Sequence, residues 1–154
     1  MFGDWMIKVL FVCLGNICRS KMAEYMFKDM LKIRNISNMF LIDSAGTSNE
    51  EYGNPIYYKA KKLLLNKNIE VDNKTARKMN TEDYNNFDYI IAMEKSNIFA
   101  INRIVEDKDN KVKLLLDFSN NPRDISDPWY HNDFKKTFEE IKEGLESFLK
   151  YLGY

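Results

Sequence analysis

The sequence predicts an α/β fold, a single domain built on a doubly wound, four-stranded parallel sheet with helices on both faces. Three observations predict it. Four short apolar runs alternate with segments of helical spacing, and the segments between them can hold crossovers between parallel strands. A chain of 154 residues suits one domain covering residues 1–154. It contains no internal repeat, low-complexity tract or linker that would divide it.

The apolar runs are the predicted strands, at residues 6–12, 39–42, 88–93 and 112–116. The first run is continuous except for Lys8, which is typical of a parallel strand covered on both faces. Ligands of such sheets bind beyond the carboxyl ends of the strands, at the topological switch point. The end of the first run is therefore a candidate site.

Helical patterns follow and separate these runs, at residues 22–33, 55–66, 81–87, 95–105 and 134–152. We expect Pro55 in the first turn of the second helix and a capping sequence at residues 81–83 to begin the third. The last helix has apolar residues at alternating steps of four and three. We interpret this stripe as one face packed on the sheet, because the segment is short for a coiled coil.

The loop over residues 13–20, between the first strand and the first helix, carries the predicted chemistry. Such a loop points backbone N–H groups inward, and the helix dipole adds positive charge, so it is a natural phosphate-binding loop. Cys13 opens it, and the N–H groups together with Arg19 favour a thiolate there. Arg19 can hold two oxygens of a phosphate-like group. A lone cysteine after a strand is more often a core residue, but the accompanying loop residues favour a nucleophile.

Composition excludes several classes of function. Lys plus Arg and Asp plus Glu both number 23, so the net charge is zero and no nucleic-acid partner is expected. Charged residues and Asn interrupt the apolar stretches, so we expect no transmembrane span and no membrane partner. Residues 1–8 lack the charged lead and cleavage site of a secretion signal. The expected location is the cytoplasm.

The chain has two cysteines, Cys13 and Cys18, too few for a disulfide framework. A bridge across this short loop would constrain little of the chain. Two interpretations of Cys18 remain open. It packs under the loop, or it condenses with a sulfenic acid at Cys13 and protects that residue from irreversible oxidation.

Residues 13–20 read C-L-G-N-I-C-R-S and resemble, at every position, the loop of the low-molecular-weight protein tyrosine phosphatase family. The resemblance implies hydrolysis of phosphotyrosine and small aryl phosphates through a cysteinyl-phosphate intermediate, without cofactor or metal. It implies that Cys13 and Arg19 are catalytic and that the other loop residues bind phosphate: Leu14, Gly15, Asn16, Ile17, Cys18 and Ser20. Ser20 would also hydrogen-bond the Cys13 sulfur and ease its departure. The expected partners are phosphotyrosine-containing proteins, and the expected state is a monomer, with weak self-association left open.

Phosphoryl transfer through cysteine also needs an acid to protonate the leaving oxygen. The candidate is Asp127, in a long loop predicted over residues 117–131, and Pro128 biases it toward an extended conformation. An Asp-Pro pair alone is a common turn, but this fragment resembles the family's acid loop, D-P followed by two aromatic residues. Trp129 and Tyr130 would then wall the slot for the substrate ring or simply pack the loop.

Further segments extend the resemblance. Residues 43–48 resemble the family's D-S-A-G-T-S, which implies that Ser44 supports Asn16. Residues 75–77 are similar to its x-A-R segment, and residues 87–90 to its F-D-x-I strand entry.

The chain departs from the family pattern at three positions. Lys21 stands where most members have Pro, and Lys74 where many have a His bonded to the loop Asn. Glu50 stands where an aromatic residue often lines the pocket rim, so it is a candidate substrate-binding residue. We therefore expect a rearranged support of Asn16 and an altered substrate preference.

Three alternatives follow from the same residues. Arsenate reductases coupled to thioredoxin share this type of loop but rely on further cysteines downstream, and this chain has none after Cys18. Protein arginine phosphatases are also similar but typically have Thr where Ile17 stands, so Ile17 favours phosphotyrosine. A phospho-binding module using the loop as an anion receptor is the third, and the set of Cys13, Arg19 and Asp127 argues against it.

Other catalytic arrangements find little support. His131 is the only histidine, and it is expected to be solvated or to cap a helix rather than to act as a base. One His and two Cys do not form a metal cluster, and no Gly-Lys-Ser/Thr sequence follows Gly15 as in a nucleotide-binding loop.

Overall fold

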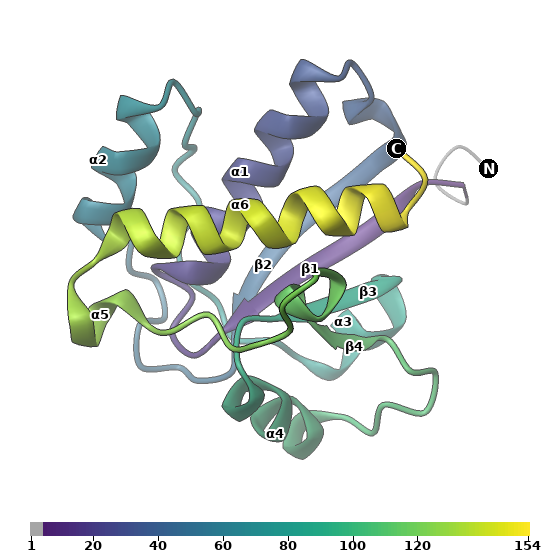
Figure 1. Cartoon of the computed structure of the whole chain (residues 1–154). Helices are drawn as coiled ribbons and strands as arrows, with labels where there is room; N and C mark the ends of the chain where they lie inside the picture. Colours follow the sequence, from purple (N-terminus) through teal and green to yellow (C-terminus); the bar gives the residue numbers. More distant parts are fainter. Residues whose placement is uncertain (1–4) are drawn as a thin grey trace.

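The computed structural model describes residues 5–154, which contain one parallel sheet with the strand order β2-β1-β3-β4 (Figure 1). The strands are β1 (Ile7–Cys13), β2 (Phe40–Gly46), β3 (Tyr89–Ala92) and β4 (Val112–Leu114). The helices are α1 (Arg19–Ile33), α2 (Tyr58–Asn66), α3 (Thr81–Asn86), α4 (Lys95–Ile104), α5 (Pro128–His131) and α6 (Phe134–Tyr151), with 3-10 turns η1 (Ser37–Met39) and η2 (Leu115–Phe118). The predicted fold class is confirmed, and the switch point lies between β1 and β3.

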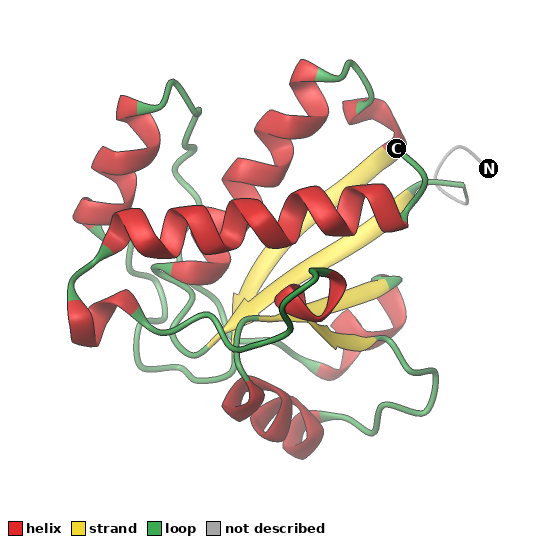
Figure 2. Cartoon of the chain, viewed as in Figure 1, coloured by secondary structure: helices red, strands yellow, loops and turns green. Residues whose placement is uncertain are grey.

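Side chains of β1 alternate between two cores, one on each face of the sheet. Val9 and Phe11 join the core that also contains residues of α1, α2 and α6. Leu10 and Val12 join the core that contains residues of α3 and α4. Figure 2 shows the helices on both sides of the strands. The run in β1 is therefore apolar at successive positions because neither face meets solvent.

The apolar stripe of α6 packs in the core on one face of the sheet. This is the packing that the spacing of its apolar residues predicts. Phe148 of α6 lies 5.7 Å from Phe27 of α1, measured between ring centroids. Phe27 in turn meets Phe11 of β1 and Phe40 of β2 edge-on, each at 5.8 Å. These rings join α1 and α6 to the two strands that lead into the candidate site.

The predicted start of α2 and the predicted cap of α3 are wrong, whereas α3 begins at Thr81 as predicted. α2 begins at Tyr58 rather than at Pro55, because the backbone N–H of Tyr57 is bonded to the Ile17 carbonyl at 2.9 Å and Tyr57 is extended, with ψ of 135°. The cap of α3 is Asn80 rather than the segment from Thr81. Its side chain accepts from the N–H of Asp83, and the Asp83 carboxylate accepts from the N–H of Asn80.

Strand and loop limits also differ from the sequence prediction. β2 extends to Gly46 because every one of its residues pairs with β1, while the predicted first residue, Met39, belongs to η1. β3 and β4 are shorter than predicted, and the last residues of the fourth run form η2. The predicted loop over residues 117–131 contains the end of η2 and the whole of α5. Local hydrophobicity marked the strands, although their limits depend on partners distant in sequence, and it gave no signal for α5.

In the part of the chain that the structure describes, no helix combines the length and apolar character needed to cross a membrane. The predicted lack of a secretion signal involves residues 1–4, which lie outside the described residues.

Candidate active site

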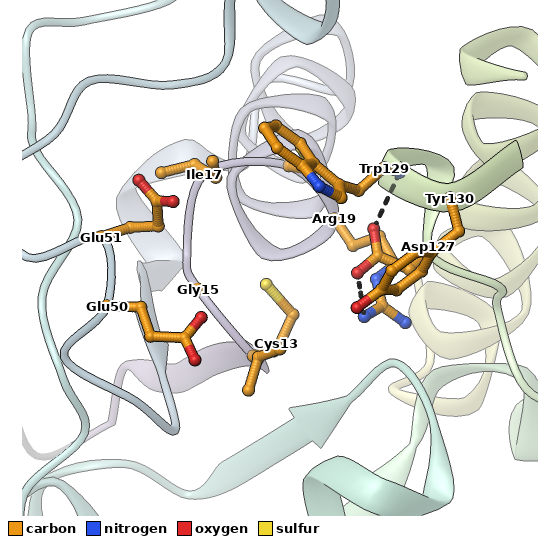
Figure 3. Close-up of a pocket in the computed structure, with 11 residues that line it drawn as sticks. Cys13, Gly15, Ile17, Arg19, Glu50, Glu51, Asp127, Trp129 and Tyr130 are labelled. Atoms are coloured by element: carbon orange, nitrogen blue, oxygen red, sulfur yellow. Dashed lines mark hydrogen bonds and ion pairs between the residues drawn. The ribbon is translucent and has the colours of Figure 1, made fainter. Parts of the chain in front are cut away.

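The carboxyl end of β1 opens into a pocket of about 150 Å³ (Figure 3). Three segments wall it: the loop after β1, the loop between β2 and α2, and the chain at the start of α5. The lining residues are Cys13, Leu14, Gly15, Ile17, Cys18, Arg19, Glu50, Glu51, Asp127, Trp129 and Tyr130. The predicted site residues Asn16, Ser20 and Ser44 lie buried outside this lining. The structure thus brings together residues more than a hundred positions apart.

Asn16 holds the turn of the loop. Its φ of 61° lies in the left-handed region, which Asn tolerates better than most side chains. Its amide nitrogen donates to Ser20 Oγ at 2.8 Å and to Ser44 Oγ at 3.0 Å, and its oxygen accepts from the backbone N–H of Arg77 at 3.1 Å. Ser20 Oγ lies 3.0 Å from Cys13 Sγ. The amide of Asn16 therefore connects the loop to β2 and to the serine beside the sulfur.

Arg19, the first residue of α1, is 1% exposed and contacts two other segments, the one after β3 and the one before α5. Nη1 donates to the Ile125 carbonyl at 2.7 Å and lies 3.2 Å from a Glu94 oxygen, and Nη2 lies 3.4 Å from Asp127 Oδ2. Burial alone would lower the pKa of Arg19, but the negative charges of Cys13, Glu94 and Asp127 raise it above its ordinary value. The guanidinium at the pocket therefore stays positively charged.

Asp127 is placed by the helix that follows it. It is the N-cap of α5, with an extended backbone, and its Oδ1 accepts from the Trp129 N–H at 3.0 Å. Oδ2 faces Arg19, and Figure 3 shows the carboxylate on the same side of the pocket as Trp129 and Tyr130. These aromatic side chains are 53% and 81% exposed, so both have free surface at the mouth.

Cys13 and Cys18 are both buried and unbridged. Burial raises the pKa of the Cys18 thiol, and the negative charges of Cys13 and Asp127 raise it further, against the opposing effect of Arg19. Cys18 is therefore a neutral thiol at physiological pH. The two cysteines differ in their surroundings, because the Cys13 sulfur has the Ser20 hydroxyl as a hydrogen-bond partner.

A buried carboxylate stands behind the loop and meets both lysines that depart from the family pattern. Glu24 of α1 is fully buried and accepts from Ser44 Oγ at 2.6 Å. Lys74 Nζ donates to its other oxygen at 2.9 Å and to Asp43 at 2.7 Å, and the buried Lys21 Nζ lies 3.8 Å from Glu24. Lys74 thus makes no direct hydrogen bond to Asn16 and is connected to it by two routes, one through Glu24 and Ser44 and one through Asp43 and Arg77.

His131 ends α5 and lies outside the residues that line the pocket. Its ring contacts the Ser126 hydroxyl at 3.1 Å and accepts from the Asp133 N–H at 2.9 Å. Among residues 5–154, no group of three or more His, Cys, Asp or Glu side chains is arranged to hold a metal ion.

Sequence reasoning missed three residues that the structure places at or beside the site. Glu51 lines the pocket, Glu94 pairs with Arg19, and the N–H of Tyr57 bonds to the Ile17 carbonyl. Glu51 directly follows a predicted rim residue, so its position was a usable signal. Glu94 and Tyr57 carried none, because their contacts depend on how distant segments pack.

The chain matches the family model described as low molecular weight phosphotyrosine protein phosphatase over residues 8–153. The chain belongs to this family. It is 38% identical to the low molecular weight protein-tyrosine-phosphatase YfkJ of Bacillus subtilis, covering 94% of each chain. It is also 38% identical to the human low molecular weight phosphotyrosine protein phosphatase, covering 92% of this chain and 93% of that one. The predicted family and the predicted class of enzyme, a protein-tyrosine phosphatase, are therefore confirmed.

Solved structures of the family superpose closely on the chain. The crystal structure of YfkJ gives a TM-score of 0.92 at 36% identity and covers 96% of this chain and 95% of that one. The structure of a Drosophila arginine phosphatase gives a TM-score of 0.88 at 28% identity, and the match covers 96% of this chain and 99% of that one. The fold therefore houses phosphatases named for two different phosphorylated residues, and the choice between them depends on the pocket of this chain.

Replacing Lys74 with Met tests the charge cluster of this phosphatase. Removal of one partner of a buried carboxylate leaves uncompensated charge, so we expect the free energy of unfolding to fall by about 2 kcal/mol at neutral pH. Breaking a buried ion pair usually costs ~3–5 kcal/mol, and the smaller loss is expected here because Lys28 still pairs with Glu24. Burial would raise the pKa of Asp43, but Lys74 and Arg77 hold it below its ordinary value. This stabilisation exists above the unfolded pKa of Asp and is lost as the pH falls through the lower folded value.

The measurement is urea unfolding of the wild type and of Lys74→Met from neutral pH down to about pH 3, the region where Asp titrates. The difference between them should be largest at neutral pH and shrink below about pH 4, the ordinary Asp value. Lys32→Met is the matched control, because Lys32 pairs with Glu70 at 2.9 Å on the exposed surface. Equal losses in the two variants would contradict the role given to Lys74.

Proposed function

We propose that this protein hydrolyses phosphotyrosine in proteins, and small aryl phosphates, through a phosphorylated Cys13. The observation that carries the proposal is that Cys13, Arg19 and Asp127 line the same pocket. The Cys13 thiolate attacks phosphorus, an S–P bond forms and the P–O bond to the phenol breaks. The carboxylic acid of Asp127 gives its proton to the phenolic oxygen. Water then attacks phosphorus, its proton passes to Asp127, and the S–P bond breaks to release phosphate.

The other predicted residues have supporting roles in this proposal. Arg19 and the backbone N–H groups of the loop from Leu14 to Cys18 hold the equatorial oxygens as their negative charge is redistributed. The Ser20 hydroxyl, at 3.0 Å from the sulfur, stabilises the departing thiolate. Ser44 and Asn16 keep the loop in its turn. Trp129 and Tyr130, with exposed ring surface at the mouth, stack on the substrate ring.

Glu50 and Glu51 give the pocket an acidic rim opposite Trp129 and Tyr130 (Figure 3). Glu51 is oriented by its own loop, since it accepts from the Asn54 side chain at 2.7 Å. Glu50 is exposed and contacts the substrate at the rim. A phosphotyrosine flanked by Lys or Arg would gain from these charges, and an acidic neighbour would be repelled. The preferred substrates are therefore phosphotyrosine proteins with basic sequence around the modified residue.

The remaining features of the proposal rest on composition and fold. One catalytic domain covers residues 1–154, and it acts in the cytoplasm as a monomer, with weak self-association left open. It uses no cofactor or metal and has no membrane partner. It also has no nucleic-acid partner, and the zero net charge supports this last statement. A sulfenic acid at Cys13 would condense with the Cys18 thiol to form a disulfide and release water, instead of advancing to irreversible oxidation states. Because burial raises the pKa of the Cys18 thiol, this step is slow until that proton is lost.

Phosphotyrosine and phosphoarginine peptides of the same flanking sequence, assayed side by side, test the function. We expect repeated turnover of phosphotyrosine and at least about tenfold lower kcat/KM for phosphoarginine. The reason is that Ile17 lines the pocket with an apolar side chain, which cannot hydrogen-bond the guanidinium group of phosphoarginine. Release of phosphate equal to the enzyme, without turnover, would instead indicate a binding module. A preference for phosphoarginine would overturn the assignment.

Replacing Asp127 with Asn tests the proposed acid. The amide cannot supply the proton, so kcat/KM, which reports the transfer from substrate to enzyme, should fall about a hundredfold or more for phenols that leave poorly and far less for those that leave well. Steady-state kinetics over a series of aryl phosphates measure this as a steeper dependence of rate on the pKa of the leaving phenol. Equal slowing across the series would remove Asp127 from this role.

A further inference from the structure

Tyr57 lies where the phosphate-binding loop, α2, α5 and α6 meet. It directly precedes α2, and its backbone N–H donates to the carbonyl of Ile17, a residue of the phosphate-binding loop, at 2.9 Å. Its main chain is thus fixed to the wall of the pocket. The family resemblance assigned this residue no role, and the proposed mechanism does not use it.

The ring of Tyr57 packs between two aromatic residues of the acid side. It meets Trp129 of α5 edge-on at 4.9 Å and stacks on Phe134, the first residue of α6, at 5.8 Å with 23° between the planes. Phe134 is buried, whereas Trp129 is half exposed. One part of the Trp129 ring therefore rests on Tyr57 while the remainder is open at the pocket mouth.

A second contact joins this part of the chain to α5. Lys59 Nζ of α2 donates to Asn132 Oδ1 at 2.7 Å, and Asn132 is the left-handed residue that ends α5. Figure 1 shows α5 directly before α6, whose first turn lies beside one end of α2. α5 has a single turn, so its own hydrogen bonds do little to fix its orientation. Tyr57 and Lys59 therefore both contact the segment that carries Asp127.

We propose that Tyr57 is a positioning residue that holds Trp129, and through α5 the carboxyl group of Asp127, in register with the phosphate-binding loop. The inference rests on the proposed function. One residue contacts both halves of the site: its backbone contacts the loop that presents Cys13, and its ring contacts the helix capped by Asp127. Proton transfer to the leaving oxygen requires hydrogen-bond distance, so a small displacement of α5 slows it more than it slows attack by sulfur.

The experiment compares Tyr57→Ala, Tyr57→Phe and Tyr151→Ala over a series of aryl phosphates. Tyr57→Ala should lower kcat/KM, which reports the transfer from substrate to enzyme, about tenfold to a hundredfold for phenols that leave poorly and much less for those that leave well. Tyr57→Phe keeps the ring and should show the wild-type dependence of kcat/KM on the pKa of the leaving phenol. Tyr151 is the matched control, because it is a tyrosine of α6 that is 63% exposed, lines no part of the pocket and packs on Phe118. Its replacement should leave this dependence unchanged.

A second readout does not depend on activity. In a Trp5→Phe background Trp129 is the only tryptophan, and Tyr57→Ala should make its fluorescence more accessible to acrylamide while Tyr151→Ala should not. A uniform loss of rate across all leaving groups, or unchanged quenching of Trp129, would overturn the proposal. Absence of phosphatase activity in the wild type would instead count against the proposed function, and Trp129 quenching would still decide the positioning.

Discussion

The site depends on one buried guanidinium. Arg19 connects the end of the phosphate-binding loop to the segment after β3 through Glu94, and to the chain before α5 through Ile125 and Asp127. A buried charge of this kind is tolerated only when hydrogen bonds and opposite charges compensate its lost hydration. Loss of Arg19 would therefore remove the interaction that holds the three segments together, and with it the side chain to which the proposed mechanism gives phosphate binding.

The parallel sheet makes this convergence possible. β1 lies inside the sheet, so its carboxyl end faces the crevice at the switch point, where the segments after β2 and β3 also arrive. α1 begins at Arg19 immediately after the loop, which adds its dipole to the same place. Glu24, Ser44 and Asn16 then fix the loop from behind. Fold and chemistry share these residues, so the pocket is preorganised before substrate arrives.

The sequence predicted the features that local pattern determines. The apolar run of β1, the amphipathic stripe of α6, and the loop and acid motifs were readable because each is contiguous. The start of α2 was not, because the Tyr57 N–H is bonded to Ile17, forty positions earlier. Glu94 and the routes from Lys74 to Asn16 were also hidden, since they depend on side chains that meet only in the folded chain. Departures from the family pattern showed where support would change, without showing the new partners.

In the proposed mechanism the Cys13 sulfur carries the phosphoryl group during turnover. This can be measured by quenching the enzyme with a denaturant at alkaline pH, where an S–P bond survives, during hydrolysis of a phosphotyrosine peptide and mapping the added phosphoryl group by mass spectrometry. We expect a phosphoryl group on Cys13 and none on Cys18, and no phosphorylated enzyme or turnover in Cys13→Ser. Turnover by Cys13→Ser, or a phosphoryl group on another residue, would contradict it.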